Sequence, residues 1–163
     1  ERNKPRPLRP AYFGAMLLES TGYAVLCALL VSVTVGWLFF MHPVPLMAQA
    51  GRPGFWTSLA LSLGAGLYEE LFFRVLLVGG MAWGFKRLFQ DRTKGYVAAA
   101  LIGAAIFSAV HYIGPFGDPF TVASFSFRFL FGLALNAIYL VRGFGITAWT
   151  HALYDVMVVT QML

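Results

Sequence analysis

The sequence places two adjacent carboxylates, Glu69 and Glu70, in the middle of a long apolar run, and Arg74 follows four residues after the second. A charge near the centre of a membrane helix costs at least ~2.5–3.5 kcal/mol, so each of these groups needs a compensating partner. Residues four apart lie on one helical face, and Glu70 and Arg74 can therefore pair. We interpret this pair as structural support for a site rather than as its chemistry.

Glu69 has no such partner on its own helix. It points about 100° away from Glu70, and the positions four before and four after it are Ala65 and Phe73. It therefore needs a proton or a partner from another helix. An unpaired carboxylate of this kind can act as a general base toward water.

The chain has three histidines: His42 in a proline-rich loop, His111 at the end of an apolar run, and His151 in the last apolar run, four residues before Asp155. A carboxylate and two imidazoles from three helices can hold and polarise a water, with Glu69 as the base and a histidine assisting or stabilising an oxyanion. Glu69, His111 and His151 could instead ligate zinc, since His₂Glu is a known catalytic ligand set.

The composition predicts that these residues lie in a membrane protein. Apolar residues make up 59% of the 163 positions and charged residues 12%, whereas soluble domains carry roughly 45–50% and about 25%. Cys27 is the only cysteine, which excludes an internal disulfide. Because the chain opens on Glu1 rather than Met, we interpret it as a trimmed piece that lacks upstream helices.

Five apolar segments are long enough to cross a bilayer, which takes about 20 residues per span. We predict one all-α domain over residues 1–163, a polytopic transmembrane helix bundle. Gly79 and Gly80 are expected to end or bend the second span. The predicted spans cover about 15–41, 55–85, 95–113, 121–141 and 146–163.

The basic residues cluster at alternate ends of these spans, although the net charge of +5 alone could suggest nucleic acid. They indicate topology and contact with anionic lipid, so we expect membrane lipid as a partner and no nucleic acid. By the positive-inside tendency, the amino end and the 86–94 loop are cytoplasmic. Glu19 is expected at the interface, and Arg128 at the bundle edge or against a headgroup. The opposite loops hold only Arg52 and Asp118.

Three motifs resemble those of the CPBP intramembrane proteases, which include the CaaX prenyl proteases. Residues 69–74 read EELFFR and match EExxxR, residues 107–111 read FSAVH and match FxxxH, and residues 151–155 read HALYD and match HxxxN/D. The motifs occur in the family's order, and the resemblance covers roughly residues 66–159, the expected catalytic core. Asn136 departs from the pattern, because a small residue is common there.

The resemblance implies an intramembrane endopeptidase that cuts near a prenylated or otherwise membrane-associated end of its substrate. It also implies that Glu69 and His111 activate water, while His151 and Asp155 stabilise the oxyanion. The ion pair of the first motif would hold that motif in place. A prenylated CaaX end, a bacteriocin leader and a carboxyl-terminal sorting signal, as in myxosortase-type relatives, all remain open as substrates.

The family is named a metalloprotease by motif analogy. We expect a glutamate base without a cofactor and keep zinc on Glu69, His111 and His151 as the alternative. We also expect a multi-pass protein of the bacterial inner membrane that acts on a peptide or protein substrate. The oligomeric state does not follow from the sequence.

Two other classes of function compete with the protease. Buried Glu, His and Asp residues also mark proton paths in transporters, and a catalytically silent immunity or scaffold protein would keep the fold.

The expected span boundaries do not place the site residues at one depth in the membrane. They place Glu69 mid-span, His111 near the outer end and His151 near the inner end, which at ~1.5 Å per residue separates them in depth by roughly ten ångströms or more.

Overall fold

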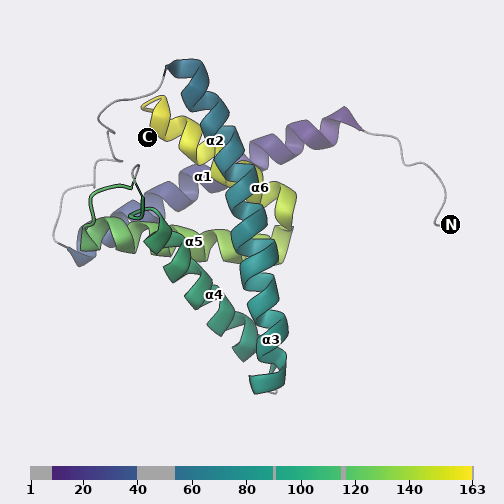
Figure 1. The fold of residues 1–163 in the computed structure, drawn as a ribbon. Helices are drawn as coiled ribbons and strands as arrows, with labels where there is room; N and C mark the ends of the chain where they lie inside the picture. The colour runs from purple at the N-terminus through teal and green to yellow at the C-terminus, as the bar shows by residue number, and fades with distance from the viewer. Residues whose placement is uncertain (1–8, 40–53, 90, 115–116, 163) are drawn as a thin grey trace.

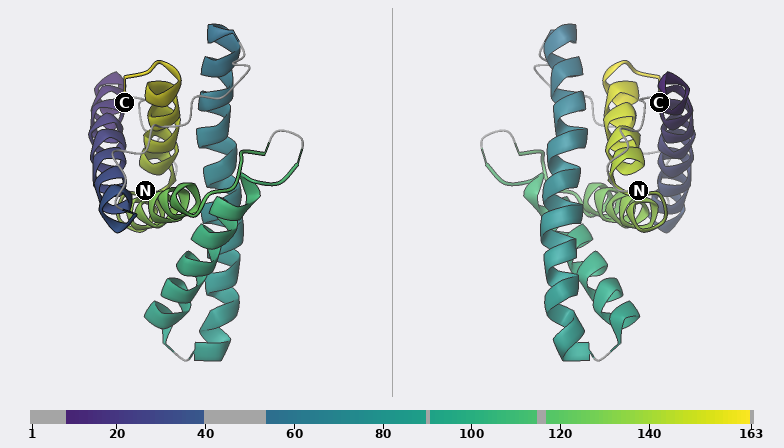
Figure 2. Two further views of the ribbon diagram at one scale, coloured as in Figure 1. Left: turned by 90° about the vertical axis from the view of Figure 1, so that its left-hand side faces the viewer. Right: turned by 90° about the vertical axis from the view of Figure 1, so that its right-hand side faces the viewer.

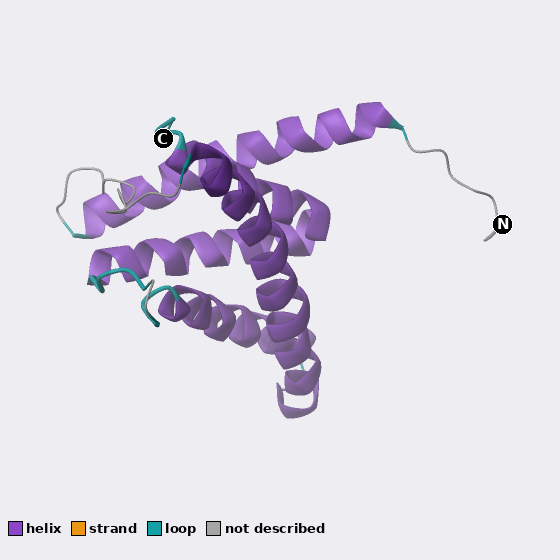
Figure 3. Ribbon diagram, turned by 45° about the horizontal axis from the view of Figure 1, so that its top comes forward, coloured by secondary structure: helices purple, strands orange, loops and turns teal. Residues whose placement is uncertain are grey.

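The structure is a computed structural model that describes residues 9–39, 54–89, 91–114 and 117–162. The described residues form helices and contain no strand (Figure 3). The prediction of an all-α fold is therefore confirmed. The predicted proline-rich loop with His42 lies outside the described residues.

Among the described residues, three helices are long and apolar enough to cross a membrane: α1 (Pro10–Leu38), α4 (Arg92–Val110) and α5 (Val122–Arg142). Their 29, 19 and 21 residues correspond to lengths of about 28–44 Å at ~1.5 Å per residue, against a hydrocarbon core of about 30 Å. The prediction of a polytopic membrane protein is confirmed. Asp91 caps α4, since its Oδ1 accepts hydrogen bonds from the backbone N–H groups of Thr93 and Lys94.

The second predicted span forms one continuous helical rod (Figure 1). It consists of α2 (Phe55–Glu70), a π-helical segment η1 (Leu71–Val78) and α3 (Gly79–Phe89). The expectation that Gly79 and Gly80 end or bend the helix is wrong, since Gly79 keeps helical angles of φ −60° and ψ −44°. Within a bilayer the backbone has no water to bond to, and this favours an unbroken helix.

The last helix, α6 (Phe144–Val159), follows α5 after the single residue Gly143. Gly143 has φ of +80°, a conformation that glycine adopts without steric cost. With 16 residues, α6 is shorter than a full span, and it packs with α1 and α5 around an apolar core. This core includes Ala24, Val31, Val35, Phe127, Phe131, Leu135 and Tyr154.

Glycines bring together the helices that carry the three motifs. A Cβ on Gly66 of α2 would lie 2.5 Å from the Cβ of Ala152 on α6, and one on Gly132 of α5 would lie 3.0 Å from the ring of Phe107 on α4. Small residues allow membrane helices this close approach. In Figure 2, α1, α6 and α2 stand side by side, α3 continues the line of α2 beyond them, and α4 runs at an angle to α3.

Candidate active site

Glu70 lies at the centre of a fully buried polar network. Its Oε2 is 2.9 Å from Nε of Arg74, with side chains that are 0% and 1% exposed, so the predicted ion pair is confirmed. Arg74 also donates to the backbone carbonyl of Gly132 at 3.3 Å, and its guanidinium lies 4.7 Å from the ring centre of Phe107. The network therefore joins η1 to α4 and α5.

Glu70 also holds His151, a contact that the sequence analysis missed. Oε1 of Glu70 lies 2.7 Å from Nδ1 of His151. Because an ionised carboxylate only accepts hydrogen bonds, the proton of this bond is on Nδ1. The rings of Phe107 and Phe131 each meet the imidazole edge-on at 5.8 Å. The orientation of His151 is thus fixed, and its Nε2 points away from Glu70.

Glu69, unlike the buried and paired Glu70, is partly exposed and unpaired. Its side chain is 32% exposed, and among the described residues its Oε2 has no hydrogen-bond partner. This oxygen lies 3.9 Å from Nε2 of His111 and 4.0 Å from Nε2 of His151. Both distances exceed the ~2.7–3.2 Å of a direct hydrogen bond and suit one bridging water.

His111 is the C-cap residue of α4. Its Nδ1 lies 2.7 Å from the backbone carbonyl oxygen of Phe107. A carbonyl oxygen only accepts, so Nδ1 carries the proton, and Nε2 turns its lone pair toward Glu69 when the ring is neutral. The two histidines therefore share one arrangement: each is anchored through Nδ1 and presents Nε2 to the same carboxylate oxygen.

Asp155 lies one helical turn beyond His151, and its Oδ2 is 3.6 Å from Nε2 of that histidine. The structure thus brings together all four residues proposed for the chemistry: Glu69, His111, His151 and Asp155. The expected depth difference of ten ångströms or more is wrong. His151 lies in the middle of α6 rather than near its inner end, and the helices cross at steep angles (Figure 1).

A second polar cluster holds the loop that follows His111. Arg128 on α5 forms an ion pair with Asp118 and donates to the hydroxyls of Tyr112, at 2.8 Å, and Ser124. The backbone N–H of Asp118 in turn donates to the carbonyl of His111 at 2.9 Å. Arg128 therefore ties the end of α4 to α5.

Asn136, the departure from the family pattern, is accommodated between α4 and α5. Its Nδ2 donates to the carbonyl of Ala100 at 3.2 Å, and its own backbone carbonyl accepts from the hydroxyl of Tyr96 at 3.1 Å. The larger side chain at this position therefore adds an interhelical hydrogen bond.

Zinc is the alternative that the residue types around Glu69 allow. Glu69, His111 and His151 have the composition of a His₂Glu zinc site. In the part of the chain that the structure describes, however, no group of three or more His, Cys, Asp or Glu side chains is placed to hold a metal ion. The side chains as they stand do not fit zinc, and no reaction step is derived through it.

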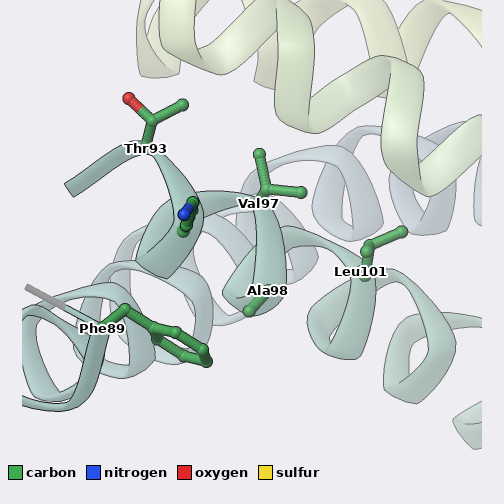
Figure 4. A pocket seen from close by; sticks show the side chains of 6 residues that line it. Phe89, Thr93, Val97, Ala98 and Leu101 are labelled. Carbon is green, nitrogen blue, oxygen red and sulfur yellow. The ribbon is translucent and has the colours of Figure 1, made fainter. Parts of the chain in front are cut away.

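A shallow groove of about 390 Å³ lies between α3 and α4 (Figure 4). It contains none of the residues that meet around Glu69, and its only ionisable side chain is Lys94. The groove is therefore separate from the candidate active site. Its lining consists of Phe89, Thr93, Lys94, Val97, Ala98 and Leu101.

The chain matches the model of a known protein family. The model of the family described as "Type II CAAX prenyl endopeptidase Rce1-like" matches residues 51–157. The matched region is more than half of the chain and contains all three motifs and the residues that surround Glu69. No curated protein and no solved structure matches the chain.

Proposed function

The chain belongs to the type II CAAX prenyl endopeptidase Rce1-like family, and we propose that it hydrolyses a peptide bond with Glu69 as the base that activates water. At family level it is an intramembrane CAAX-type endopeptidase, and its apolar helices make it an integral membrane protein. The observation that carries the proposal is the Oε2 atom of Glu69, which lies without a hydrogen-bond partner among the described residues, about 4 Å from two imidazole nitrogens.

In the first step, a water bound between Glu69 and His111 donates a hydrogen bond to the carboxylate. Glu69 takes its proton as the oxygen attacks the carbonyl carbon of the substrate. Nε2 of His111 accepts the second hydrogen bond of the water and orients its lone pair. A positioned general base of this kind contributes typically ~10²–10⁴-fold to the rate.

In the second step, the carbonyl oxygen becomes an oxyanion, and a protonated Nε2 of His151 donates a hydrogen bond to it. The carboxylates of Glu70, on Nδ1, and of Asp155, near Nε2, stabilise the imidazolium electrostatically. Glu69 then transfers its proton to the departing amide nitrogen, and the carbon–nitrogen bond breaks. Atoms and protons balance with water as the only co-reactant.

Glu70 and Arg74 are positioning residues that orient His151. Both side chains are buried and touch each other, His151, α4 and α5. They are suited to keep Nε2 of His151 directed at the reacting carbonyl. Placing two charges in a membrane helix costs free energy. The positioning role explains why this chain has a buried charge pair there in spite of that cost.

The proposed substrate is a peptide or protein whose cleaved end is held at the membrane, either by a prenyl group or by a carboxyl-terminal sorting signal. We place the enzyme in the bacterial inner membrane with its amino end in the cytoplasm. The positive-inside tendency supports this orientation.

The function is tested by assaying the purified protein in detergent on two peptides, one with a prenylated CaaX end and one with a carboxyl-terminal sorting signal. Glu69→Ala, His111→Ala and His151→Ala are expected to abolish cleavage of whichever peptide the unmutated protein cuts. Cleavage by all three variants at the unmutated rate would refute the site assignment.

The metal-free mechanism has its own test. Metal analysis of the active preparation is expected to show no stoichiometric zinc, and chelators are expected to leave the rate unchanged. One zinc per chain together with inhibition by a chelator would overturn the metal-free mechanism while leaving the protease activity standing.

A further inference from the structure

The Glu70–Arg74 ion pair is held from α5 as well as from within its own helix. Nη2 of Arg74 donates to the backbone carbonyl of Gly132 at 3.3 Å. In an α-helix the N–H of residue 136 donates to the carbonyl of residue 132, and a carbonyl oxygen can accept two hydrogen bonds. The carbonyl of Gly132 therefore joins Arg74 to the backbone of Asn136, one turn further along α5.

Asn136 in turn anchors this part of α5 to α4. Its Nδ2 donates to the carbonyl of Ala100 at 3.2 Å, and its own carbonyl accepts from the hydroxyl of Tyr96 at 3.1 Å. Asn136 is 3% exposed, and in the interior of a membrane no water replaces a hydrogen bond that is lost. The place at which Gly132 presents its carbonyl to Arg74 therefore depends on the bonds between Asn136 and α4.

Asn136 and Arg74 also have complementary hydrogen-bonding groups. Oδ1 of Asn136, an acceptor, and Nη1 of Arg74, a donor, are both buried and have no hydrogen-bond partner among the described residues. Tyr96, which bonds to the carbonyl of Asn136, lies close enough to Arg74 to interact with it electrostatically. Buried polar groups are normally hydrogen-bonded, and one internal water can satisfy two of them. The side chain of Asn136 thus offers Arg74 a second link besides the carbonyl of Gly132.

Arg74 transmits its position to His151 through Glu70. Nε of Arg74 lies 2.9 Å from Oε2 of Glu70, and Oε1 of the same carboxylate lies 2.7 Å from Nδ1 of His151. The three side chains are 1%, 0% and 4% exposed. Because closely packed interiors transmit strain rather than absorb it, a displacement of Arg74 is expected to reach the imidazole.

We propose that Asn136 is a positioning residue of the active site. It fixes the turn of α5 that holds Arg74 and, through Arg74 and Glu70, it fixes the direction of Nε2 of His151. The proposal rests on the proposed function and deepens it, because Nε2 of His151 is there the donor to the oxyanion. Asn136 acts only through these neighbours and takes no part in the making or breaking of bonds.

The test compares Asn136→Leu with the matched control Ser20→Ala. Leu has the branched shape and the number of non-hydrogen side-chain atoms of Asn, but it has no hydrogen-bonding group. Ser20→Ala removes a buried interhelical bond of the same kind and length, from Oγ of Ser20 to the carbonyl of Ile146 at 3.2 Å. This bond joins α1 to α6, so the control loosens the helix that carries His151 without touching Arg74.

The first measurement is the chemical shift of the Nδ1–H group of His151 in protein with isotope-labelled histidine, which reports the bond to Glu70 and requires no cleavage. Asn136→Leu is expected to shift this resonance, and Ser20→Ala is expected to leave it in place. Tyr96→Phe, which removes only the hydroxyl bond to the carbonyl of Asn136, is expected to give a smaller shift and replaces Asn136→Leu if that variant does not fold. An unchanged resonance, or an equal shift in Ser20→Ala, would overturn the proposal.

The second measurement is the cleavage rate. A misplacement of a catalytic group by ~1 Å can cost about 10²-fold in rate. Because His151 keeps its bond to Glu70, we expect a smaller displacement in Asn136→Leu, with a kcat loss on the order of tenfold and an unchanged KM. A raised KM with the unmutated kcat would contradict the positioning role. If no variant cleaves either peptide but the resonance of His151 shifts as expected, the proposed function fails and the positioning by Asn136 stands.

Discussion

Glu69 and Glu70 are neighbours in one helix, yet they lie in opposite environments. Glu70 is fully buried and touches both Arg74 and His151. Glu69 is partly exposed and has an oxygen without a hydrogen-bond partner in the described structure, about 4 Å from two imidazoles. Because successive helical residues differ by about 100° in direction, Glu70 faces the interhelical core, whereas Glu69 faces His111 and the Nε2 side of His151.

Of the two carboxylates, Glu69 is the one that is free to react. A buried carboxylate that is paired on both oxygens is held in its charged form and contributes to structure, and removing one partner leaves an uncompensated charge. A carboxylate with an unpartnered oxygen, such as Oε2 of Glu69, can accept a proton without dismantling a network. The comparison therefore assigns chemistry to Glu69 and positioning to Glu70.

The largest expected effect is on catalysis by Glu69→Gln. We expect kcat to fall by roughly 10²–10⁴-fold, because the amide is no longer a general base. The thermal unfolding midpoint in detergent should stay at the unmutated value, since no described hydrogen bond is lost. A comparable loss of stability would place Glu69 in the structural network instead and would break the comparison.

Glu70→Gln is expected to have the next largest effect, this time on stability. Loss of the charge leaves the Arg74 guanidinium buried without a counter-ion, which costs on the order of 3–5 kcal/mol. The measurement is the free energy of unfolding in mixed micelles. An unfolding free energy equal to that of the unmutated protein would show that the buried pair does not support the fold.

The contact between α2 and α6 positions His151 beside Glu70, and Gly66 is at its centre. Gly66→Ala adds a Cβ about 2.5 Å from Ala152, next to His151, and overpacking of this kind costs about 1–3 kcal/mol. Gly64→Ala is the matched control, because a Cβ there meets nothing within 4 Å. Equal unfolding midpoints for the two variants would contradict the close approach of these helices.

The smallest effect is expected from Arg128→Gln, which acts only on the Glu69 side. The substitution releases the loop after His111. A misplacement of a catalytic group by ~1 Å can cost about 10²-fold in rate. Because Nδ1 of His111 keeps its own hydrogen bond, we expect a smaller displacement and a kcat loss on the order of tenfold. KM should change little. Arg128→Lys should recover part of the rate by restoring the charge opposite Asp118.

Arg142→Gln is the control for this experiment. Arg142 also forms an interhelical ion pair, with Glu19 at 2.5 and 2.7 Å, but it lies at the opposite end of α5. We expect its kcat to match that of the unmutated protein. An equal loss of kcat in both variants would mean that Arg128 supports only the bundle.

The sequence alone predicted the contacts between residues that are four apart in one helix. The spacing of Glu70 and Arg74 predicts their ion pair, because a separation of four residues defines a helical face whatever surrounds it. The spacing of His151 and Asp155 predicts their proximity in the same way. The composition and the apolar runs were sufficient for the all-α membrane fold.

Contacts between different helices could not be predicted from local residue spacing. The bond from Glu70 to His151 joins residues 81 positions apart, and no local spacing encodes it. The interfacial prediction for Glu19 likewise missed its ion pair with Arg142, 123 positions away. The apparent depth difference between Glu69 and His111 arose because residue counts give distance along a helix and contain no crossing angle.

The π-helical segment was also missed. It begins at Leu71, directly after the two carboxylates, and contains Arg74. Such segments are rare and frequently lie at functional sites, but the sequence offers no propensity signal that separates them from α-helix. The glycines at its end suggested a break, but Gly79 keeps helical angles and the rod continues into α3.

The most direct test of the division between the two carboxylates is to measure cleavage rate and unfolding midpoint together for Glu69→Gln and Glu70→Gln, purified in one detergent. We expect Glu69→Gln to keep the unmutated midpoint and lose cleavage, and Glu70→Gln to have a lowered midpoint. If Glu69→Gln cleaves at the unmutated rate while remaining folded, Glu69 is not the base, and the proposed mechanism is wrong.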